Sequence, residues 1–357
     1  MSTTSIKKNK VLIIGNHKPD EQMVANMELR YGASVETMYK DTIGIRSINP
    51  LTRHLSYLLL AIRALRRQKN YDVLIFWQQF IGIYYALFGY LVKTYPRHAV
   101  ILTFIYNRRK SLIGFFHRML YRLTVNSGSI RSIVVHSELE LDHYCQIFKN
   151  CEKFEFIRVG TRHPLKHQVL NGSGGYFFAA GRSNRDYHTL IQAFRLQPHP
   201  LKIACLRESL HGMNLPENVE PHFDAYGSKY LELLEHAYAV IIPIDDVNIS
   251  AGQLVLIEAL RLGKICIVTE GPCLKDYIDP SCMFTVPPHD PEALAERVDK
   301  LYNERGWFEM SARARELYEQ QYTITQYGER LSKYLLSGPP IPRTQNHQQV
   351  RNPDHRL

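Results

Sequence analysis

The sequence predicts an α/β protein of two doubly wound domains, and three observations support this fold class. Apolar, β-rich runs alternate with segments of helical periodicity along most of the chain, which is typical of parallel sheets covered by helices. The 357 residues, 45% of them apolar, are enough to fill two cores of ordinary domain size. A polar, glycine-rich segment at residues 158–175 (RVGTRHPLKHQVLNGSGG) separates two halves that both show the alternation.

The N-terminal half opens with a strand over Lys10–Ile14 and the βα turn Gly15-Asn16-His17. His17 therefore sits on a turn that we expect to line a cleft. His136, at the end of another predicted strand, is interpreted as structural, because Ser137 and Glu140 have the spacing of a capping box that starts a helix. The remaining strands predicted in this half are Asp72–Trp77, Ala99–Phe104 and Ser132–His136.

Charge is unevenly shared between the halves. Residues 1–150 hold 21 Lys/Arg against 9 Asp/Glu, and between Thr42 and Arg131 there are 14 basic residues and one acid, Asp72. Two segments of this span, Leu51–Lys69 and Leu112–Leu123, are basic, amphipathic and aromatic, as helices in an anionic membrane interface are. Alternatively, Leu51–Lys69 is an ordinary helix with a solvated basic face. We favour membrane association because this helix carries no acid.

Val73–Val92 has no charged residue in 20 positions, about the length of a membrane-spanning helix. Its first part has the pattern of a strand, and two Gln, two Gly and three Tyr interrupt the apolar run. We therefore predict a buried strand followed by an apolar helix rather than a membrane span.

Two loops of the C-terminal half have the character of an anion site. The strand Gly174–Ala180 leads into Gly181-Arg182-Ser183-Asn184-Arg185-Asp186-Tyr187, and a helix follows from about His188. Farther on, the strand Tyr238–Ile244 precedes the small-residue loop Ser250-Ala251-Gly252-Gln253, which opens a helix that Gly263 stops.

A helix N-terminus offers unpaired N–H groups and the positive end of the helix dipole, and small residues let a phosphate approach. Glu258, two turns after Ser250, can reach hydroxyls beside that phosphate, and a phosphate with a diol describes a nucleotide sugar. Two alternatives stay open. The second loop belongs to an ordinary βα unit without a ligand, or Arg185 pairs with Asp186 or with a neighbouring helix.

These two elements resemble the donor site of family-4 glycosyltransferases with the GT-B fold. Family members carry a Gly-Arg followed by a nearby Lys, which Arg182 and Arg185 match here. They also carry a Glu, a small-residue turn, and a second Glu eight positions later followed by Ala. Glu258 and Ala259 match the second Glu and the Ala, whereas Ser250 stands in place of the first Glu, which leaves the donor sugar open.

The resemblance implies that Arg182 and Arg185 bind the donor diphosphate, that the backbone of Ala251–Leu254 binds the diphosphate and sugar, and that Glu258 binds the ribose. The donor-binding set is then Gly15, Arg182, Arg185, Ser250, Ala251, Gly252, Gln253, Leu254 and Glu258, with no metal ligand.

The resemblance covers about residues 10–335 and implies two Rossmann-like doubly wound domains that face each other across a cleft. We predict an acceptor- and membrane-facing domain at 1–160 and a nucleotide-sugar-binding domain at 161–320. A helix at 321–336 returns to the first domain, and the tail at 337–357 is disordered. Within the second domain, the segment Asn218–Ala225, before a helix at Lys229–Ala237, is implied to pack beside the nucleotide base. Gly306–Leu336 is predicted to form one or two amphipathic helices.

Many family members place a catalytic His near the strand that here runs into Phe104–Arg109, where this chain has none. We take His17 as the candidate catalytic side chain, together with Arg182 and Arg185, which stabilise the departing nucleoside diphosphate. Retaining transfer, in which a donor phosphate oxygen accepts the proton, needs neither a protein base nor a metal. We therefore expect no cofactor.

The sequence thus predicts a glycosyltransferase that moves a sugar from a nucleoside-diphosphate donor, UDP rather than GDP, to an acceptor hydroxyl. The basic first half indicates a membrane-bound, lipid-linked saccharide acceptor in polysaccharide or glycan assembly. Alternatives are an inverting GT-B transferase, a GT-B sugar-nucleotide epimerase, or a basic nucleic-acid-binding protein. Against the last, the chain has no nucleic-acid-binding motif, so no nucleic-acid partner is expected.

The six cysteines are spread out without CxxC spacing, and four fall in or beside predicted buried elements. We expect reduced core thiols rather than a metal site. The polar start, MSTTSIKKNK, does not resemble a signal peptide. We therefore expect a cytoplasmic protein that is peripheral on the inner face of the cell membrane.

Overall fold

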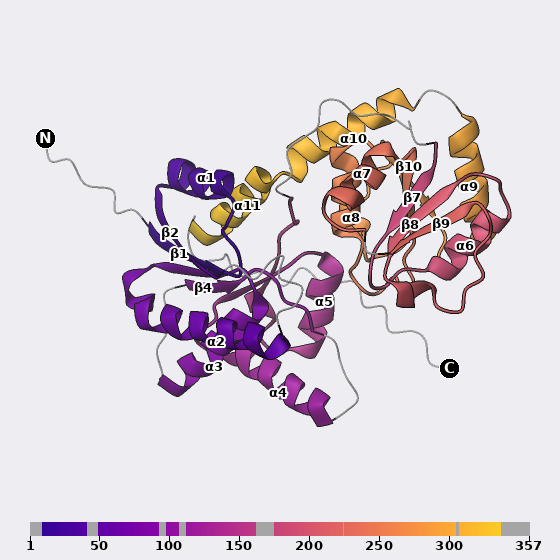
Figure 1. Ribbon diagram of the computed structural model, residues 1–357. Helices are drawn as coiled ribbons and strands as arrows, with labels where there is room; N and C mark the ends of the chain where they lie inside the picture. Colours follow the sequence, from indigo (N-terminus) through magenta and orange to yellow (C-terminus); the bar gives the residue numbers. More distant parts are fainter. Residues whose placement is uncertain are drawn as a thin grey trace, which may run out of the picture.

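The computed structural model describes residues 9–40, 49–92, 98–106, 112–161, 175–223, 225–304 and 307–336. The described chain forms two parallel six-stranded sheets, each covered by helices on both faces (Figure 1). The first contains β1 (Asn9–Gly15), α1 (Glu21–Tyr31), β2 (Ala33–Tyr39), α2 (Pro50–Arg67), β3 (Val73–Phe76), α3 (Gln79–Val92), β4 (His98–Ile101), α4 (Leu112–Asn126), β5 (Ser132–Val135), α5 (Glu138–Ile147) and β6 (Phe154–Phe156). The second contains β7 (Phe177–Ala180), α6 (Tyr187–Arg195), β8 (Leu201–Cys205), β9 (Val219–Phe223), α7 (Ser228–His236), β10 (Ala239–Ile242), α8 (Gln253–Arg261), β11 (Cys266–Thr269), β12 (Met283–Val286) and α9 (Pro291–Asn303).

The strand orders are β2-β1-β3-β4-β5-β6 and β12-β11-β10-β7-β8-β9. In each sheet the chain winds outward in one direction and then returns to wind in the other. The order therefore reverses between β1 and β3 in the first sheet and between β7 and β10 in the second. The prediction of two doubly wound α/β domains is confirmed.

The strands follow the predicted apolar runs; β1 is one residue longer at each end than predicted, whereas most of the others are shorter. The predicted strand Ala99–Phe104 ends at Ile101, because the chain leaves the sheet after Leu102 donates its N–H to Phe76. The apolar residues beyond this point still enter the core, as Phe104 does beneath α4 and α5. The apolar pattern therefore predicted which segments are buried more accurately than it predicted where each strand stops pairing with its neighbours.

Two helices close the chain, α10 (Phe308–Gln321) and α11 (Ile324–Leu336), and α11 crosses back to the first domain (Figure 1). Its apolar face, with Tyr327 and Leu331, packs in one core with Met23 and Met27 of α1. The close approach depends on Gly328, since a Cβ at this position would lie 2.7 Å from Met23 Cγ. The predicted return of the C-terminal helix is confirmed.

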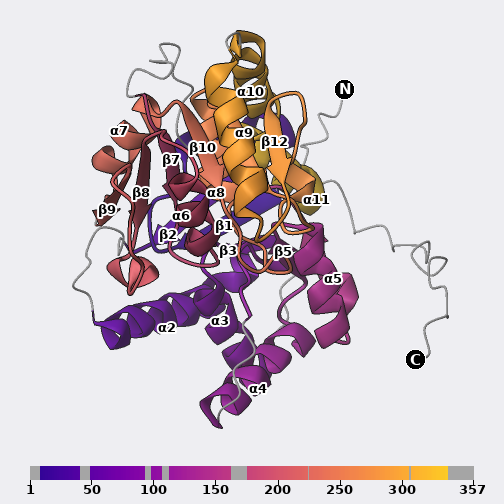
Figure 2. The same ribbon diagram turned by 90° about the vertical axis from the view of Figure 1, so that its right-hand side faces the viewer.

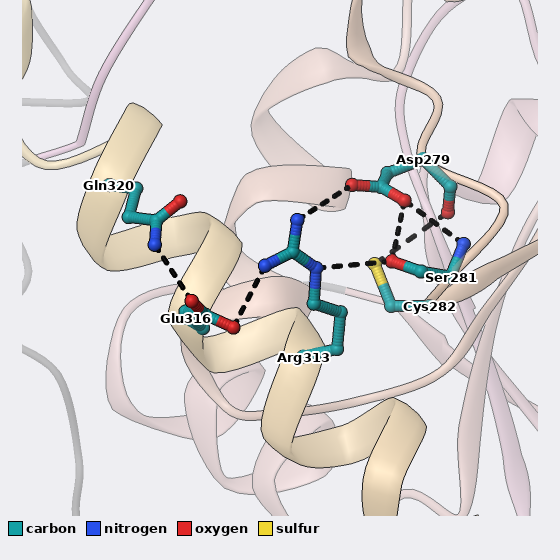
Figure 3. A network of polar contacts seen from close by, with 6 residues as sticks. All are labelled: Asp279, Ser281, Cys282, Arg313, Glu316 and Gln320. Carbon is teal, nitrogen blue, oxygen red and sulfur yellow. Dashed lines mark hydrogen bonds and ion pairs between the residues drawn. The ribbon is translucent and has the colours of Figure 1, made fainter.

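A polar network holds α10 against the turn that precedes β12 (Figure 3). Arg313 donates from Nη1 to Glu316 at 2.8 Å and from Nε to Ser281 Oγ at 3.2 Å, and its Nη2 lies 3.7 Å from Asp279. Gln320 donates to the other oxygen of Glu316 at 2.8 Å. Because Arg313 is exposed, this network orients α10 on the domain rather than supplying much stability.

The two domains also meet between the start of α5 and the segment Asp276–Tyr277. Tyr277 donates its hydroxyl to the carbonyl of His136 at 2.7 Å, and the Asp276 carboxylate accepts the N–H of Glu138 at 2.9 Å. The view in Figure 2 shows α5 below the second domain, beside the path of α11.

The cysteines depart from expectation at one place. Cys145 and Cys151 are joined by a disulfide, whereas Cys205, Cys266, Cys273 and Cys282 are free and buried as expected. The expectation of a thiol was wrong for the first pair, because the turn after α5 brings their Cα atoms to 4.7 Å, within reach of a disulfide. The spacing of the two cysteines in the sequence did not indicate that the chain turns back after α5 and brings them together.

The uncharged run Val73–Val92 divides into β3 and α3, as the sequence predicted. Among the described residues, none of the helices combines the length and the hydropathy that a bilayer crossing needs. The tail at 337–357 lies outside the described residues.

Candidate nucleotide-binding site

The two loops singled out from sequence leave adjacent strands at the reversal point of the second sheet. The loop Gly181–Asp186 follows β7, and the loop from Pro243 to Gly252 follows β10, which pairs directly with β7. In open α/β sheets, ligands bind outside the carboxyl ends of the strands where the strand order reverses. The topology thus brings together two segments that are about seventy residues apart in sequence.

A pocket of about 250 Å³ opens at this point. One wall comes from the first loop, with Gly181 and Arg182, and another from Val255 in the first turn of α8. The remaining lining residues come from β7, β8, the segment before α7 and the start of α7: Ala180, Ala204, Cys205, Ala225, Tyr226, Gly227 and Tyr230. The pocket therefore combines small apolar floor residues with aromatic and cationic groups at its sides, which suits a flat heterocyclic ring.

Arg182 lies at the edge of this pocket. Its guanidinium carbon is 4.3 Å from the centre of the Tyr226 ring, a cation–π arrangement, and the side chain is otherwise exposed. This geometry places Arg182 beside the pocket mouth, and its exposed N–H groups remain available to a ligand.

Arg185 takes a different direction and folds under its own loop. Its Nε donates to the carbonyl of Ala180 at 3.0 Å, and its Nη1 donates to the carbonyls of Ser183 and Asn184 at 3.1 and 3.3 Å. Its Nη2 has no partner among the described residues and stays available. Burial lowers the pKa of Arg185 below its ordinary value, but a guanidinium stays charged at neutral pH. Gly181 permits this packing, since a Cβ there would lie 2.4 Å from Nε.

Arg185 makes no hydrogen bond to Asp186 among the described residues, so the alternative that the two residues pair is wrong. Asp186 accepts the N–H of Thr189 at 2.9 Å, which caps α6, and it accepts from Nδ1 of His289 at 2.8 Å. Asp186, His289 and the exposed Asp245 also form a group, found among the described residues, whose ligand atoms lie within 4.8 Å of one another. The cap and the His–Asp pair already account for this arrangement.

The helix α8 begins at Gln253, at the end of the loop from which the sequence predicted it to open. Its N-cap is Gly252, which has φ +98°, a left-handed conformation that favours glycine. No side chain caps this end, and the N–H groups of Gln253, Leu254 and Val255 have no partner among the described residues. The helix N-terminus that the sequence predicted after this loop therefore offers free donors to an anion.

Ser250 and Ala251 stay outside the helix, in the loop that leads to it. The Ser250 hydroxyl accepts a hydrogen bond from the amide of the buried Gln253, whose Nε2 also lies 3.3 Å from the carbonyl of Cys273. The position that carries the first Glu in the family thus holds a neutral, hydrogen-bonded pair.

Glu258 is buried and receives a hydrogen bond of 2.8 Å from Nε of Arg261, one turn later on α8. The Arg261 side chain is 2% exposed and that of Glu258 is 9% exposed. Burial, with a contribution from the charge of Glu258, raises the pKa of Tyr230, which lines the pocket. The carboxylate is therefore held in a buried charge pair that the sequence pattern did not reveal, and Glu258 is not among the residues that line the pocket.

Gly15 and His17 lie at the reversal point of the other sheet, where β1 meets β3. His17 Nδ1 is 2.9 Å from Oδ1 of Asn16, and its ring meets the edge of Trp77 at 5.7 Å between centroids. Trp77 in turn contacts Tyr327 of the returning helix. His17 thus stands at the carboxyl edge of the N-terminal sheet, among aromatic residues, and not in the donor loops.

His136 is structural in its contacts, as interpreted from sequence. Its Nδ1 is 3.0 Å from the carbonyl of Ile157, and burial lowers its pKa. Ser137 caps α5 through the N–H of Glu140, and Glu140 accepts the N–H of His136. The predicted capping bond from Ser137 is therefore present, and the Glu140 carboxylate turns back to the backbone of His136 and Ser137.

Sequence reasoning missed Asn184, Tyr226 and Tyr230. The resemblance implies that Asn218–Ala225 packs beside the base; the pocket includes Ala225 and continues into Tyr226 and Gly227. A Tyr-Gly pair directly before a helix was the available signal. Nothing in the sequence distinguished Asn184 from other loop asparagines.

Comparison with known proteins agrees with this geometry. Residues 176–321 match the family described as Glycosyl transferases group 1, and no curated protein matches the chain in sequence. HepE of Anabaena, solved in complex with UDP, is 14% identical with a TM-score of 0.63, covering 92% of this chain and 100% of its own. WaaG, a glycosyltransferase involved in lipopolysaccharide biosynthesis, is 13% identical with a TM-score of 0.60 and the same coverage. A glycosyltransferase from Rickettsia africae is 13% identical with a TM-score of 0.59, covering 93% of this chain and 100% of its own.

At such identities the solved structures show the fold, and the family match shows what kind of domain holds the pocket. The match covers the C-terminal domain, with both loops and α8, and the shared fold extends over both domains. The C-terminal domain of this chain thus matches the glycosyl transferases group 1 family over residues 176–321, and the two domains together have the GT-B fold.

Proposed function

We propose that the enzyme takes its sugar from a nucleoside diphosphate, UDP rather than GDP, and transfers it to an acceptor hydroxyl. The observation that carries this proposal is the pocket beside the first turn of α8, at the reversal point between β7 and β10. A heterocyclic base would fit between Tyr226 and the small floor residues. The UDP complex of HepE, which has the same fold, favours UDP.

The diphosphate would then face the free N–H groups of Gln253–Val255, with Arg185 Nη2 on the adjacent loop. These groups stabilise negative charge on the departing diphosphate, since helix N-termini and guanidinium groups favour anions. We propose retaining transfer, in which a phosphate oxygen of the donor takes the acceptor proton, so the reaction needs neither a metal nor a protein base. We propose that His17, after β1 of the first domain, faces the acceptor.

A thermal-shift series with UDP, GDP and ADP tests the donor, because a ligand that binds the folded state raises its apparent stability. We expect the largest shift with UDP, and we expect Tyr226→Ala to reduce it. Tyr90→Ala, at the exposed end of α3, is the matched control. Equal, negligible shifts with all three nucleotides would remove the nucleotide site.

Product analysis separates the enzymatic alternatives. Incubation of a UDP-sugar with the enzyme alone yields a second sugar nucleotide if the enzyme is an epimerase, and the anomeric configuration of a transferred sugar distinguishes retention from inversion. We expect no new sugar nucleotide and a retained configuration.

We further propose that the acceptor is a lipid-linked saccharide and that the N-terminal domain lies on an anionic membrane at the cytoplasmic face. The supporting observation is an apolar surface on α2, α3 and α4, which pack side by side away from α1 and α11 (Figure 1). The exposed large apolar side chains of this surface are Leu51, Leu55, Leu59, Tyr90, Leu91, Val92, Phe115, Phe116, Met119 and Leu123. Apolar patches of this kind mark protein or membrane interaction sites.

Charge favours the membrane over a protein partner. The three helices carry no acidic residue, and Arg53, Arg63 and Arg66 are exposed on α2, with Lys69 just beyond its end. The N-termini of α2 and α4 follow the carboxyl ends of their strands, so Leu51 and Phe115 lie at the sheet edge that lines the cleft. A lipid-linked acceptor on this surface would present its saccharide to that cleft.

One basic residue of α2 belongs to the fold instead. Arg67 donates to Glu36 at 2.5 Å and to the Tyr71 hydroxyl at 2.7 Å, so a test of the membrane surface should leave it in place. The test variant replaces Arg63, Arg66 and Lys69 with Gln, and the control replaces the exposed Lys149, Lys300 and Lys333 with Gln.

We expect the parent and the control to sediment with anionic vesicles, and the α2 variant to be released, since each basic side chain near an anionic surface adds up to about 1 kcal/mol of attraction. Binding should weaken as salt rises, because screening acts on exposed charges. Phe115→Ser with Phe116→Ser should reduce binding at every salt concentration. Equal sedimentation of the parent and both test variants would leave a soluble acceptor as the better proposal. Nucleic acid is tested in the same format, and we expect no retention on oligonucleotides.

A further inference from the structure

Asn184 links the two loops of the nucleotide site. It lies in the loop after β7, and its side-chain Nδ2 donates to the carbonyl of Asp246 at 2.9 Å and to the carbonyl of Ile249 at 3.1 Å. Its Oδ1 accepts the N–H of Asp246 at 2.8 Å. Two donors and one acceptor of a single amide are therefore used, all on the loop after β10.

The segment that Asn184 holds is a tight turn. Ile249 donates its N–H to the carbonyl of Asp246 at 3.1 Å, and the Asp246 carboxylate accepts the N–H of Asn248 at 2.9 Å. This turn ends three residues before Gly252, the N-cap of α8. Asn184 is therefore hydrogen-bonded to the first and last residues of this turn, which precedes the N-terminus of α8 with its free N–H groups.

The backbone of Asn184 contributes to the conformation of its own loop, which follows β7. It has φ +53°, a left-handed conformation that Asn tolerates better than most residues, and its carbonyl accepts from Nη1 of Arg185. One residue thus shapes the loop that carries Arg182 and Arg185 and ties that loop to the one before α8.

We propose that Asn184 is a positioning residue for the donor diphosphate. It fixes the spacing between the Arg185 guanidinium and the N-terminus of α8 before the ligand arrives, so that both meet the diphosphate without rearrangement. The base pocket shares Gly181 and Arg182 with the first loop, but its floor residues Ala204 and Ala225 come from β8 and the segment before α7. We therefore expect the base to bind without this link. The inference rests on the proposed function, because it concerns the same donor site.

The test compares UDP with uridine by calorimetric titration, since only UDP carries the diphosphate. Asn184→Gly removes the side-chain bonds but allows the left-handed backbone. The control is Asn214→Gly in another exposed loop, which makes the same change of residue type. Should Asn184→Gly not fold, Asn184→Ser takes its place, because a hydroxyl cannot span both carbonyls.

We expect Asn184→Gly to weaken UDP binding about 10-fold, the scale of one or two net hydrogen bonds, with uridine affinity within about 2-fold of the parent. Asn214→Gly should change neither. A parallel loss of UDP and uridine affinity, or unchanged UDP affinity, would overturn the positioning role while leaving the nucleotide site in place. A parent that binds no nucleoside diphosphate would overturn the proposed function and this inference with it.

Discussion

Arg182 and Arg185 lie on one loop, and replacing either by Ala should weaken nucleotide binding to a similar extent. The Arg185→Ala variant should also lose more stability than the Arg182→Ala variant. From sequence, both side chains are expected on an exposed loop, where either change would leave the fold intact. The structure instead encloses Arg185, which donates to the carbonyls of Ala180, Ser183 and Asn184, and leaves Arg182 exposed beside Tyr226.

The expected magnitudes follow from these contacts. Removing the Arg185 guanidinium leaves three carbonyls without their donor. Because these lie partly exposed and water can replace some of the bonds, we expect a loss of about 1–3 kcal/mol in the free energy of unfolding. Arg182 loses one exposed cation–π contact, worth about 0.5–1 kcal/mol. Each change also removes a cation from the donor site and should weaken UDP binding by about 1–3 kcal/mol.

Denaturant unfolding and calorimetric titration with UDP measure the two effects separately. Arg185→Lys is a useful third variant, because it keeps the charge but cannot serve three carbonyls and a ligand at once. We expect it to bind UDP more tightly than Arg185→Ala while remaining less stable than the parent. If Arg185→Ala is as stable as Arg182→Ala and binds UDP like the parent, the enclosed geometry and its role are both wrong.

Three further changes test other parts of the structure. Glu258→Gln should lower UDP affinity in titrations and the free energy of unfolding by up to about 3 kcal/mol, because the buried Arg261 loses its charged partner; unchanged values would separate Glu258 from the ribose. Gly160→Ala should destabilise the protein by about 1–3 kcal/mol in urea, since its Cβ would lie 2.6 Å from the Thr323 carbonyl at the start of α11; a neutral result would mean that this crossing can shift. Burial lowers the pKa of His98 from 6.5 to about 4, so the unfolded chain binds the proton first as pH falls, and the stability contributed by neutral His98, complete above pH 6.5, is lost towards pH 4. His98→Gln should flatten the fall in melting temperature over that window, and an unaltered slope would assign the acid sensitivity to other groups.

Periodicity and composition were sufficient for the architecture, because buried strands and amphipathic helices leave local signals. The run Val73–Val92 shows this, since its strand and helix were separable from its polar interruptions. The sequence also located both donor loops, as glycines and small residues after a strand mark a βα turn. The helix α8 does open from the predicted loop Ser250–Gln253, but the sequence did not show that Gly252 is its N-cap.

The relations between distant side chains were not predictable. The Glu258–Arg261 pair lies one turn apart, but nothing in the pattern showed that Arg261 is buried. Asn184 depends on a turn more than sixty residues away, and the disulfide between Cys145 and Cys151 depends on the course of the chain after α5. Such contacts arise from tertiary packing, which local sequence rules do not contain.

The central claim is that the nucleotide binds where β7 and β10 meet, and a crystal structure of the enzyme soaked with UDP tests it most directly. We expect the uracil ring in the pocket beside Tyr226, and phosphate oxygens within hydrogen-bond distance of the N–H groups of Leu254 and Val255. UDP bound elsewhere, or its diphosphate pointing away from the first turn of α8, would contradict the account.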